Sequence, residues 1–142
     1  MNKQKFWAIV GSSYLALWSI LIPAKAQAFV VKTLSVCRMP HSYWTTIRIQ
    51  QFARDTMLDQ YGWGRSEYKA LNKLWTNESH WNPMAYNPLT SEGLHAQGIP
   101  QMLRLDRHLP APQQVERGLA YISNRYGKPS IAWSHERIHG WY

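Results

Sequence analysis

The segment from Leu71 to Pro83 constrains the fold most, because it places one charged residue on the apolar face of an amphipathic helical pattern. Leu71, Leu74, Trp75 and Glu78 recur at offsets of three, four and seven residues, so all four lie on one stripe of a helix. Such a stripe normally faces a hydrophobic core. Because Pro83 prevents the helix from continuing, we expect Glu78 where the core opens to a cleft.

Partial burial of Glu78 in that position has a chemical consequence. Desolvation disfavours the ionised carboxylate and raises its pKa, which suits a general acid that works near neutral pH. The alternative interpretation is a solvated glutamate in the last turn of an amphipathic helix, and helical periodicity alone does not separate the two.

Residues 1–28 have the features of a secretory signal peptide. Lys3 and Lys5 precede a stretch from Phe6 to Ile22 that is almost free of charge, and small residues at Ala26 and Ala28 are typical of a cleavage site. An uncleaved membrane anchor is the alternative, although serine and glycine dilute the apolar stretch. We therefore predict an exported protein, either in the periplasm or extracellular at the cell wall.

Length and charge limit what the exported chain can be. The full chain has 142 residues, which is typical of one domain. Loss of residues 1–28 would remove three lysines and no acidic residue from a formal charge of +8, which leaves +5. For an exported protein, this charge favours a cell wall, an acidic glycan or a membrane surface over nucleic acid as the partner. Cys37 is the single cysteine, so no internal disulfide is expected.

The remaining pattern predicts a mainly α domain at residues 41–142, after a lead-in segment at residues 29–40. We expect a helix from about Ser42 to Tyr61 that ends at Gly62, a second helix capped by Ser66, and a third from Gln113 to Tyr126. Residues 131–142 predict a short final helix. The run from Pro83 to Gly93 reads as a long irregular loop, and no alternating run is long enough to predict a sheet.

Several motifs resemble one known family when their order and spacing are taken together. They are Trp75-x-x-Glu78-Ser79-x-Trp81-Asn82-Pro83-x-Ala85, Asn87-Pro88, Ala96-x-Gly98-Ile99-Pro100-Gln101, Gly118-x-x-Tyr121-Ile122-x-x-Arg125-Tyr126-Gly127, and Ala132-Trp133 with Gly140-Trp141-Tyr142. Over residues 50–142 the chain resembles the lysozyme-like lytic transglycosylases, and it is most similar to the small secreted group with a Gly-Ile-Pro-Gln motif.

The resemblance implies a lysozyme-like domain that cleaves the β-1,4 bond between N-acetylmuramic acid and N-acetylglucosamine in peptidoglycan. Glu78 would be the catalytic acid and base, and the product would carry a 1,6-anhydro end, since the sugar's own 2-acetamido and 6-hydroxyl groups replace a second carboxylate and water. Ser79 would support Glu78, Gln101 would bind substrate, and Tyr121 would point its hydroxyl group at the acid. Asn87 and Trp81 complete the expected substrate-binding or supporting positions.

The resemblance has departures and leaves alternatives open. The family's Ser-Gly-Ala-Tyr-Gly loop is replaced by the longer stretch from Ser91 to Gly98, so subsite preference is open. A hydrolytic muramidase and a non-catalytic wall-binding or assembly protein remain alternatives. We expect peptidoglycan strands as the partner, no cofactor and a monomer. The absence of a second wall-binding module fits local action beside an envelope-spanning secretion or conjugation machine.

Residues 135–139 fit a competing motif, H-E-x-x-H, which is typical of zinc proteases. Such sites need a third protein ligand, and the three residues after His139 provide none. We therefore expect no metal site, with His135 and His139 as surface residues. The eight Trp and eight Tyr side chains also suggest sugar-stacking surfaces, for which Trp81, Tyr86 and Trp141 are candidates.

Overall fold

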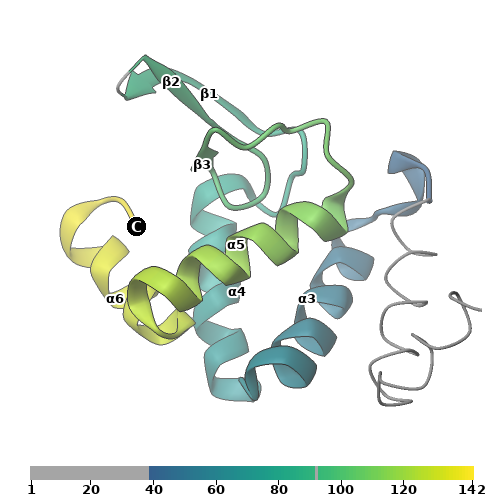
Figure 1. Cartoon of the computed structure of the whole chain (residues 1–142), viewed down its shortest axis with the longest axis vertical. Coiled ribbons are helices and arrows are strands. Elements are labelled where there is room, and N and C mark those ends of the chain that lie inside the picture. Colours follow the sequence, from purple (N-terminus) through teal and green to yellow (C-terminus); the bar gives the residue numbers. More distant parts are fainter. Residues whose placement is uncertain (1–38, 92) are drawn as a thin grey trace, which may run out of the picture. The chain divides into compact units, whose positions relative to one another are not determined.

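A computed structural model of the chain describes residues 39–91 and 93–142 (Figure 1). These residues belong to one unit, Cys37–Tyr142. The expected signal peptide and nearly all of the lead-in segment lie outside the described residues. Among the described helices, none has both the length and the apolar character that crossing a membrane requires.

Four α-helices form most of the described chain: α3 (Thr46–Tyr61), α4 (Arg65–Ser79), α5 (Ala111–Tyr126) and α6 (Pro129–His139). A short 3-10 turn, η2 (His41–Tyr43), precedes them. The prediction of a mainly α-helical fold is therefore confirmed. The predicted stops are confirmed too, because Gly62 and Gly127 follow α3 and α5 with positive φ angles that favour glycine.

The predicted helix starts were wrong. The first long helix begins at Thr46 rather than near Ser42, because the Thr45 hydroxyl accepts the Arg48 amide and caps the helix there. The second begins at Arg65 after Gly64, with no side-chain cap, so Ser66 is already inside the helix. The third starts at Ala111, two residues before Gln113.

The apolar stripe on α4 forms the centre of the core. Leu71, Leu74 and Trp75 are fully buried, and they share the core with Ile49 and Met57 of α3, Leu119 and Ile122 of α5, and Ala132 of α6. Helix α4 packs against α6 and α3, and α5 packs against α3 and α6. In Figure 1, α5 crosses α4. Gly118 permits this crossing, since a Cβ atom there would lie 2.6 Å from the Trp75 ring.

A three-stranded antiparallel sheet follows α4, and it contradicts both the predicted loop at Pro83–Gly93 and the predicted absence of a sheet. Its strands are β1 (Tyr86–Ser91), β2 (Leu94–Gln97) and β3 (Met102–Leu103), in the order β1-β2-β3. The register shifts between Tyr86 and Thr90, where Pro88 has no amide hydrogen to donate. The sequence of β2 alternates apolar and polar residues over only four positions, and all four are half-buried, so neither face is distinctly buried.

Candidate active site

Glu78 lies in the last turn of α4 and is half-buried, at the end of the stripe that carries Leu71, Leu74 and Trp75. Its pKa is raised from 4.5 to about 8. Burial is the largest cause, followed by the negative charge of Glu136 and a side-chain hydrogen bond with Glu136. At neutral pH the Glu78 carboxyl group is therefore mostly protonated, as a general acid must be before it reacts.

Glu136 brings a second carboxylate to the site from α6. Its side chain is only 6% exposed, and one carboxylate oxygen, Oε1, accepts a hydrogen bond of 2.9 Å from the Asn77 amide Nδ2. The other oxygen, Oε2, is buried, and within the described residues it accepts no hydrogen bond from an N–H or O–H donor. Because Asn77 and Glu78 are neighbours on α4, the packing of α6 on α4 places the two carboxyl groups together.

Tyr142 joins three parts of the site through its hydroxyl group. That group donates to the Pro100 carbonyl at 2.7 Å and accepts from the Trp75 indole Nε1 at 3.0 Å. Burial and the nearby charge of Glu78 raise the pKa of Tyr142 well above its ordinary value, so the hydroxyl stays protonated. Tyr142 therefore fixes the Gly-Ile-Pro-Gln segment against the helix that carries the acid.

The Gly-Ile-Pro-Gln segment is also held by the end of α4. The Ser79 hydroxyl, which is buried, donates to the Ile99 carbonyl at 2.7 Å. Ser79 thus supports the site by anchoring this segment to the turn of helix that holds Glu78. The next polar residue, Gln101, is half-buried and donates from Nε2 to the Gly98 carbonyl at 2.9 Å. Its φ of 46° is unusual for a residue with a side chain and fixes the direction in which that side chain leaves the backbone.

Gln114 of α5 organises the same segment from behind and is fully buried. Its Oε1 accepts the Ile99 amide at 2.9 Å, and its Nε2 contacts the carbonyl oxygens of Pro83, Arg107 and Leu109. Gly98 has a φ of 74°, and a Cβ atom there would lie 2.5 Å from Gln114 Oε1. Only glycine therefore fits at this close approach.

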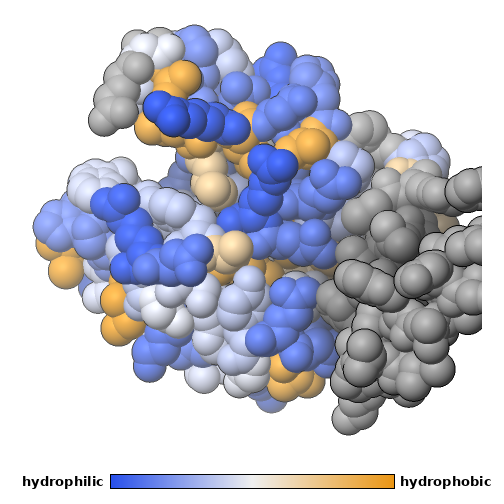
Figure 2. Space-filling model, in the orientation of Figure 1, coloured by the Kyte–Doolittle hydropathy of each residue, from blue (hydrophilic) through white to orange (hydrophobic). Residues whose placement is uncertain are grey.

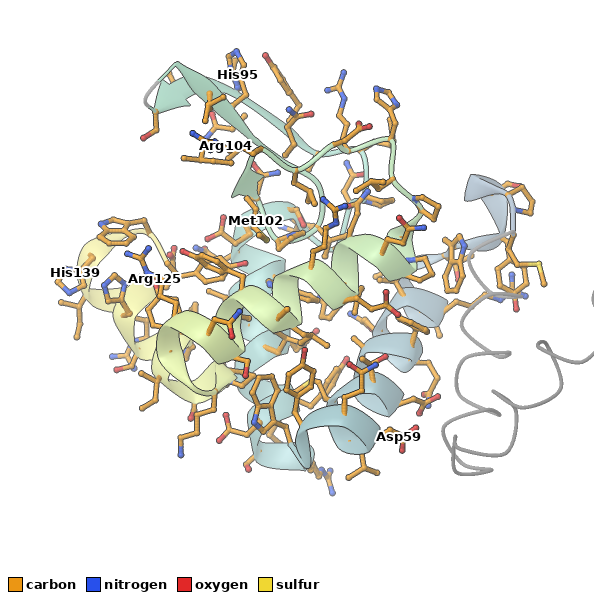
Figure 3. All side chains as sticks on the ribbon, in the orientation of Figure 1. Asp59, His95, Met102, Arg104, Arg125 and His139 are labelled. Carbon is orange, nitrogen blue, oxygen red and sulfur yellow. The ribbon has the colours of Figure 1, made fainter. Side chains whose placement is uncertain are left out.

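The surface is hollowed beside these groups. Figure 2 shows a recess between the sheet region and the region of α5 and α6. Figure 3 places Arg104 on the sheet side of this recess, Arg125 on the helix side, and Met102 between them. The C-terminal end of α4, with Glu78, reaches this part of the molecule, as the Ser79 bond to Ile99 and the Asn77 bond to Glu136 require.

The remaining predicted residues lie in different surroundings. Tyr121 is half-buried, and its ring lies 5.8 Å from the ring of Tyr142, the residue that accepts the Trp75 indole hydrogen bond. Asn87 is exposed, and its Oδ1 accepts the Leu89 amide at 3.0 Å. Tyr86 and Trp141 are 44% and 50% exposed, and Arg107 lies over the Tyr86 ring and Arg125 over the Trp141 ring.

Trp81 was wrongly predicted as a sugar-stacking residue. Its side chain is 2% exposed and packs edge-on against the Trp75 ring at 5.0 Å, so it has no free face. The indole Nε1 donates to Asn72 Oδ1 at 3.0 Å. Trp81 is therefore part of the core beneath the site.

The two histidines of the H-E-x-x-H motif lie beside Trp141. His135 Nδ1 is 2.8 Å from the Trp141 carbonyl oxygen, and the His135 and His139 rings are 4.3 Å apart. Glu136 between them faces α4 instead. Among residues 39–91 and 93–142, no group of three or more His, Cys, Asp or Glu side chains could hold a metal ion.

Glu136, Tyr142 and Gln114 were not identified as site residues from the sequence. Glu136 was assigned only to the zinc-type motif, and Tyr142 only to the closing motif of the family. The sequence does hold a signal for Glu136, since Pro129, Ala132 and Glu136 recur at spacings of three and four residues and so share one face of a helix.

Comparison of the chain with protein-family models, with curated proteins and with solved structures gave no match.

Proposed function

We propose that this protein is an exported, lysozyme-like lytic transglycosylase that cleaves the β-1,4 bond between N-acetylmuramic acid and N-acetylglucosamine. The observation that carries the proposal is Glu78, a half-buried carboxyl group with a pKa of about 8 at the end of a core helix. A group with that pKa can donate a proton at neutral pH and can take one back after the bond has broken.

The proposed reaction needs only one catalytic carboxyl group. Glu78 donates its proton to the glycosidic oxygen as the bond to C1 breaks, while the sugar's 2-acetamido oxygen bonds C1. The Glu78 carboxylate then removes the proton of the 6-hydroxyl group, whose oxygen bonds C1 and displaces the acetamido oxygen. The product is the 1,6-anhydro sugar, and Glu78 is protonated again.

The placement of Glu136 supports this single-acid chemistry. Enzymes that use two carboxyl groups keep them about 5 to 9.5 Å apart, so that the sugar or a water molecule fits between them. Glu136 instead lies within hydrogen-bonding reach of Glu78. From there it cannot reach the opposite face of a sugar bound at Glu78.

The surface around the recess fits an anionic glycan. Arg104 and Arg125 lie on its two sides, and Arg125 also lies over the Trp141 ring, which is 50% exposed. Gln101 is the candidate for a hydrogen bond to the sugar near the scissile bond. In this proposal the protein acts on peptidoglycan strands in the periplasm or wall, as a monomer, to open the wall beside an envelope-spanning machine.

Digestion of purified peptidoglycan, followed by mass spectrometry of the released muropeptides, tests the proposal. We expect products with anhydro ends, which are one water lighter than products with reducing ends. Glu78→Gln should reduce their release by several orders of magnitude, because the amide has the same shape and cannot donate the proton. Asp59→Asn makes the same chemical change at an exposed residue of α3 and serves as the matched control.

Products with reducing ends that depend on Glu78 would instead identify a hydrolytic muramidase. No digestion by a folded wild-type protein, or equal digestion by Glu78→Gln, would refute the proposed activity.

A further inference from the structure

We propose that Glu136 is a positioning residue that shares one proton with Glu78 and holds that proton on Glu78. The catalytic part of this inference rests on the function proposed above. The shared proton does not, since it follows from how α4 and α6 pack.

The two carboxylate oxygens of Glu136 differ in their hydrogen bonding. Oε1 accepts the 2.9 Å hydrogen bond from Asn77, whereas Oε2 is buried and accepts none from the N–H and O–H donors of the described residues. A buried carboxylate oxygen without a hydrogen bond destabilises the fold, because it has lost its water and gained no donor. A donor is therefore expected beside Oε2.

Glu78 can supply that donor only when it is protonated. The two side chains lie within hydrogen-bonding reach of each other, and two ionised carboxylates have no hydrogen between them. With a proton on Glu78, its O–H group donates to Glu136 and the repulsion between two negative charges disappears. One proton therefore completes the hydrogen bonding of both side chains.

Asn77 fixes one oxygen of Glu136. Its amide N–H donates to Oε1, which leaves Oε2 as the acceptor for a proton held on Glu78. Glu78 is the more exposed of the two and lies at the end of α4 beside the recess. The proton is therefore held on the side chain that can reach the substrate.

Other ionisable groups near the pair do not replace this interaction. The Tyr142 hydroxyl is close enough for its charge state to depend on both Glu78 and Glu136, but it donates its proton to Pro100. On α5, Tyr121 faces Tyr142, and Arg125 lies over the rings of Tyr121, Tyr126 and Trp141. Among the causes that raise the pKa of Glu78, the only other ionisable group is Glu136.

Glu136→Gln tests the inference in the full protein, because it removes the negative charge and keeps the shape. The amide Oε1 can still accept from Asn77, and its N–H can now donate to the Glu78 carboxylate. The Glu78 pKa should then fall by at least about one unit and remain above its ordinary value, since burial persists. Carbon-13 NMR of labelled glutamate carboxyl groups measures this pKa directly, with the Glu78 signal assigned by its absence in Glu78→Gln.

Activity should change in step with the Glu78 pKa. With a pKa one unit lower, turnover at pH 8 should fall about fivefold relative to turnover at pH 5.5, where both proteins are protonated. Glu116→Gln is the matched control, because Glu116 is another half-buried glutamate whose pKa is raised by burial, on α5 near Tyr61. It should leave the Glu78 titration unchanged.

An unchanged Glu78 pKa in a folded Glu136→Gln protein would overturn the inference and make Glu136 a packing residue only. If Glu136→Gln does not fold, Asn77→Ala replaces it. This variant keeps both carboxyl groups and frees Glu136, so it should lower the Glu78 pKa by a smaller amount, and no change would overturn the inference equally. A lowered pKa in a protein that does not digest peptidoglycan would support the shared proton and refute the proposed activity.

Discussion

Glu78→Gln should make the protein more stable at neutral pH while it removes the proposed activity. The folded protein binds the Glu78 proton more tightly than the unfolded chain, since the pKa is about 8 in the fold and 4.5 as the reference value. Between these two values the folded state holds one more proton than the unfolded state. The free energy of unfolding therefore decreases as the pH rises from about 4.5 to about 8.

The size of this loss follows from the shift. Each pH unit in the window removes at most about 1.4 kcal/mol, so the loss at pH 7 is at most about 3 kcal/mol. Glu78 is only half-buried, and solvent screening reduces the loss to about 1–2 kcal/mol. The glutamine side chain of the variant does not titrate. The variant should therefore match the wild type near pH 4 and exceed it by about 1–2 kcal/mol at pH 7 and above.

Thermal unfolding followed by circular dichroism at pH 4, 5, 6, 7 and 8 measures this difference. For a domain of this size, 1 kcal/mol corresponds to about 4–8 °C in Tm. Asp59→Asn makes the same carboxyl-to-amide change at an exposed residue and is the matched control. If the Tm difference between Glu78→Gln and wild type does not grow from pH 4 to pH 8, the ionised Glu78 carboxylate does not destabilise the fold and the argument is refuted.

Four further predictions concern the helix crossing at Gly118, two tyrosines near the site, and metal dependence. Gly118→Ala should destabilise the fold by about 1–3 kcal/mol in urea unfolding, because its Cβ would overlap a buried ring and a proline, and an unchanged midpoint would contradict the close helix crossing. Tyr142→Phe should destabilise the fold by a similar amount, about 1–3 kcal/mol, because two hydrogen bonds lose their partner. Tyr121→Phe removes only the hydroxyl group that is expected to point at Glu78, so it should keep the melting temperature and reduce turnover about 10- to 150-fold. Wall digestion should persist in EDTA and in a His135→Ala, His139→Ala double variant; loss on chelation that zinc restores would indicate a metal site instead.

Helical periodicity predicted the parts of the fold that depend on a continuous apolar stripe. Leu71, Leu74 and Trp75 are buried as their spacing requires, and the same spacing carries Glu78 to the edge of the core. The stops at Gly62 and Gly127 were also predictable, because a positive φ angle after a helix strongly favours glycine. These features depend on local chemistry that a single sequence contains.

The sheet could not be predicted in the same way, because its strands β2 and β3 are only four and two residues long and are defined by their pairing with other segments. Strand β2 is half-buried along its whole length, and Asn87 and Pro88 in β1 are residues that normally indicate turns. The role of Gln114 in holding the Gly-Ile-Pro-Gln segment could not be predicted for a related reason. It bonds backbone groups from residues 83, 99, 107 and 109, which come together only in the folded chain.

The H-E-x-x-H motif shows why a pattern of residue types does not define a site without the packing of its helix. Successive residues of a helix are about 100° apart, so Glu136 and the pair of histidines point in different directions. In α6 the buried face runs through Ala132 and Glu136, and it turns Glu136 toward Asn77 and Glu78. The histidines are left beside Trp141. The same glutamate that would be the base of a zinc protease is thus placed beside Glu78, where we propose that it holds a proton on that carboxyl group.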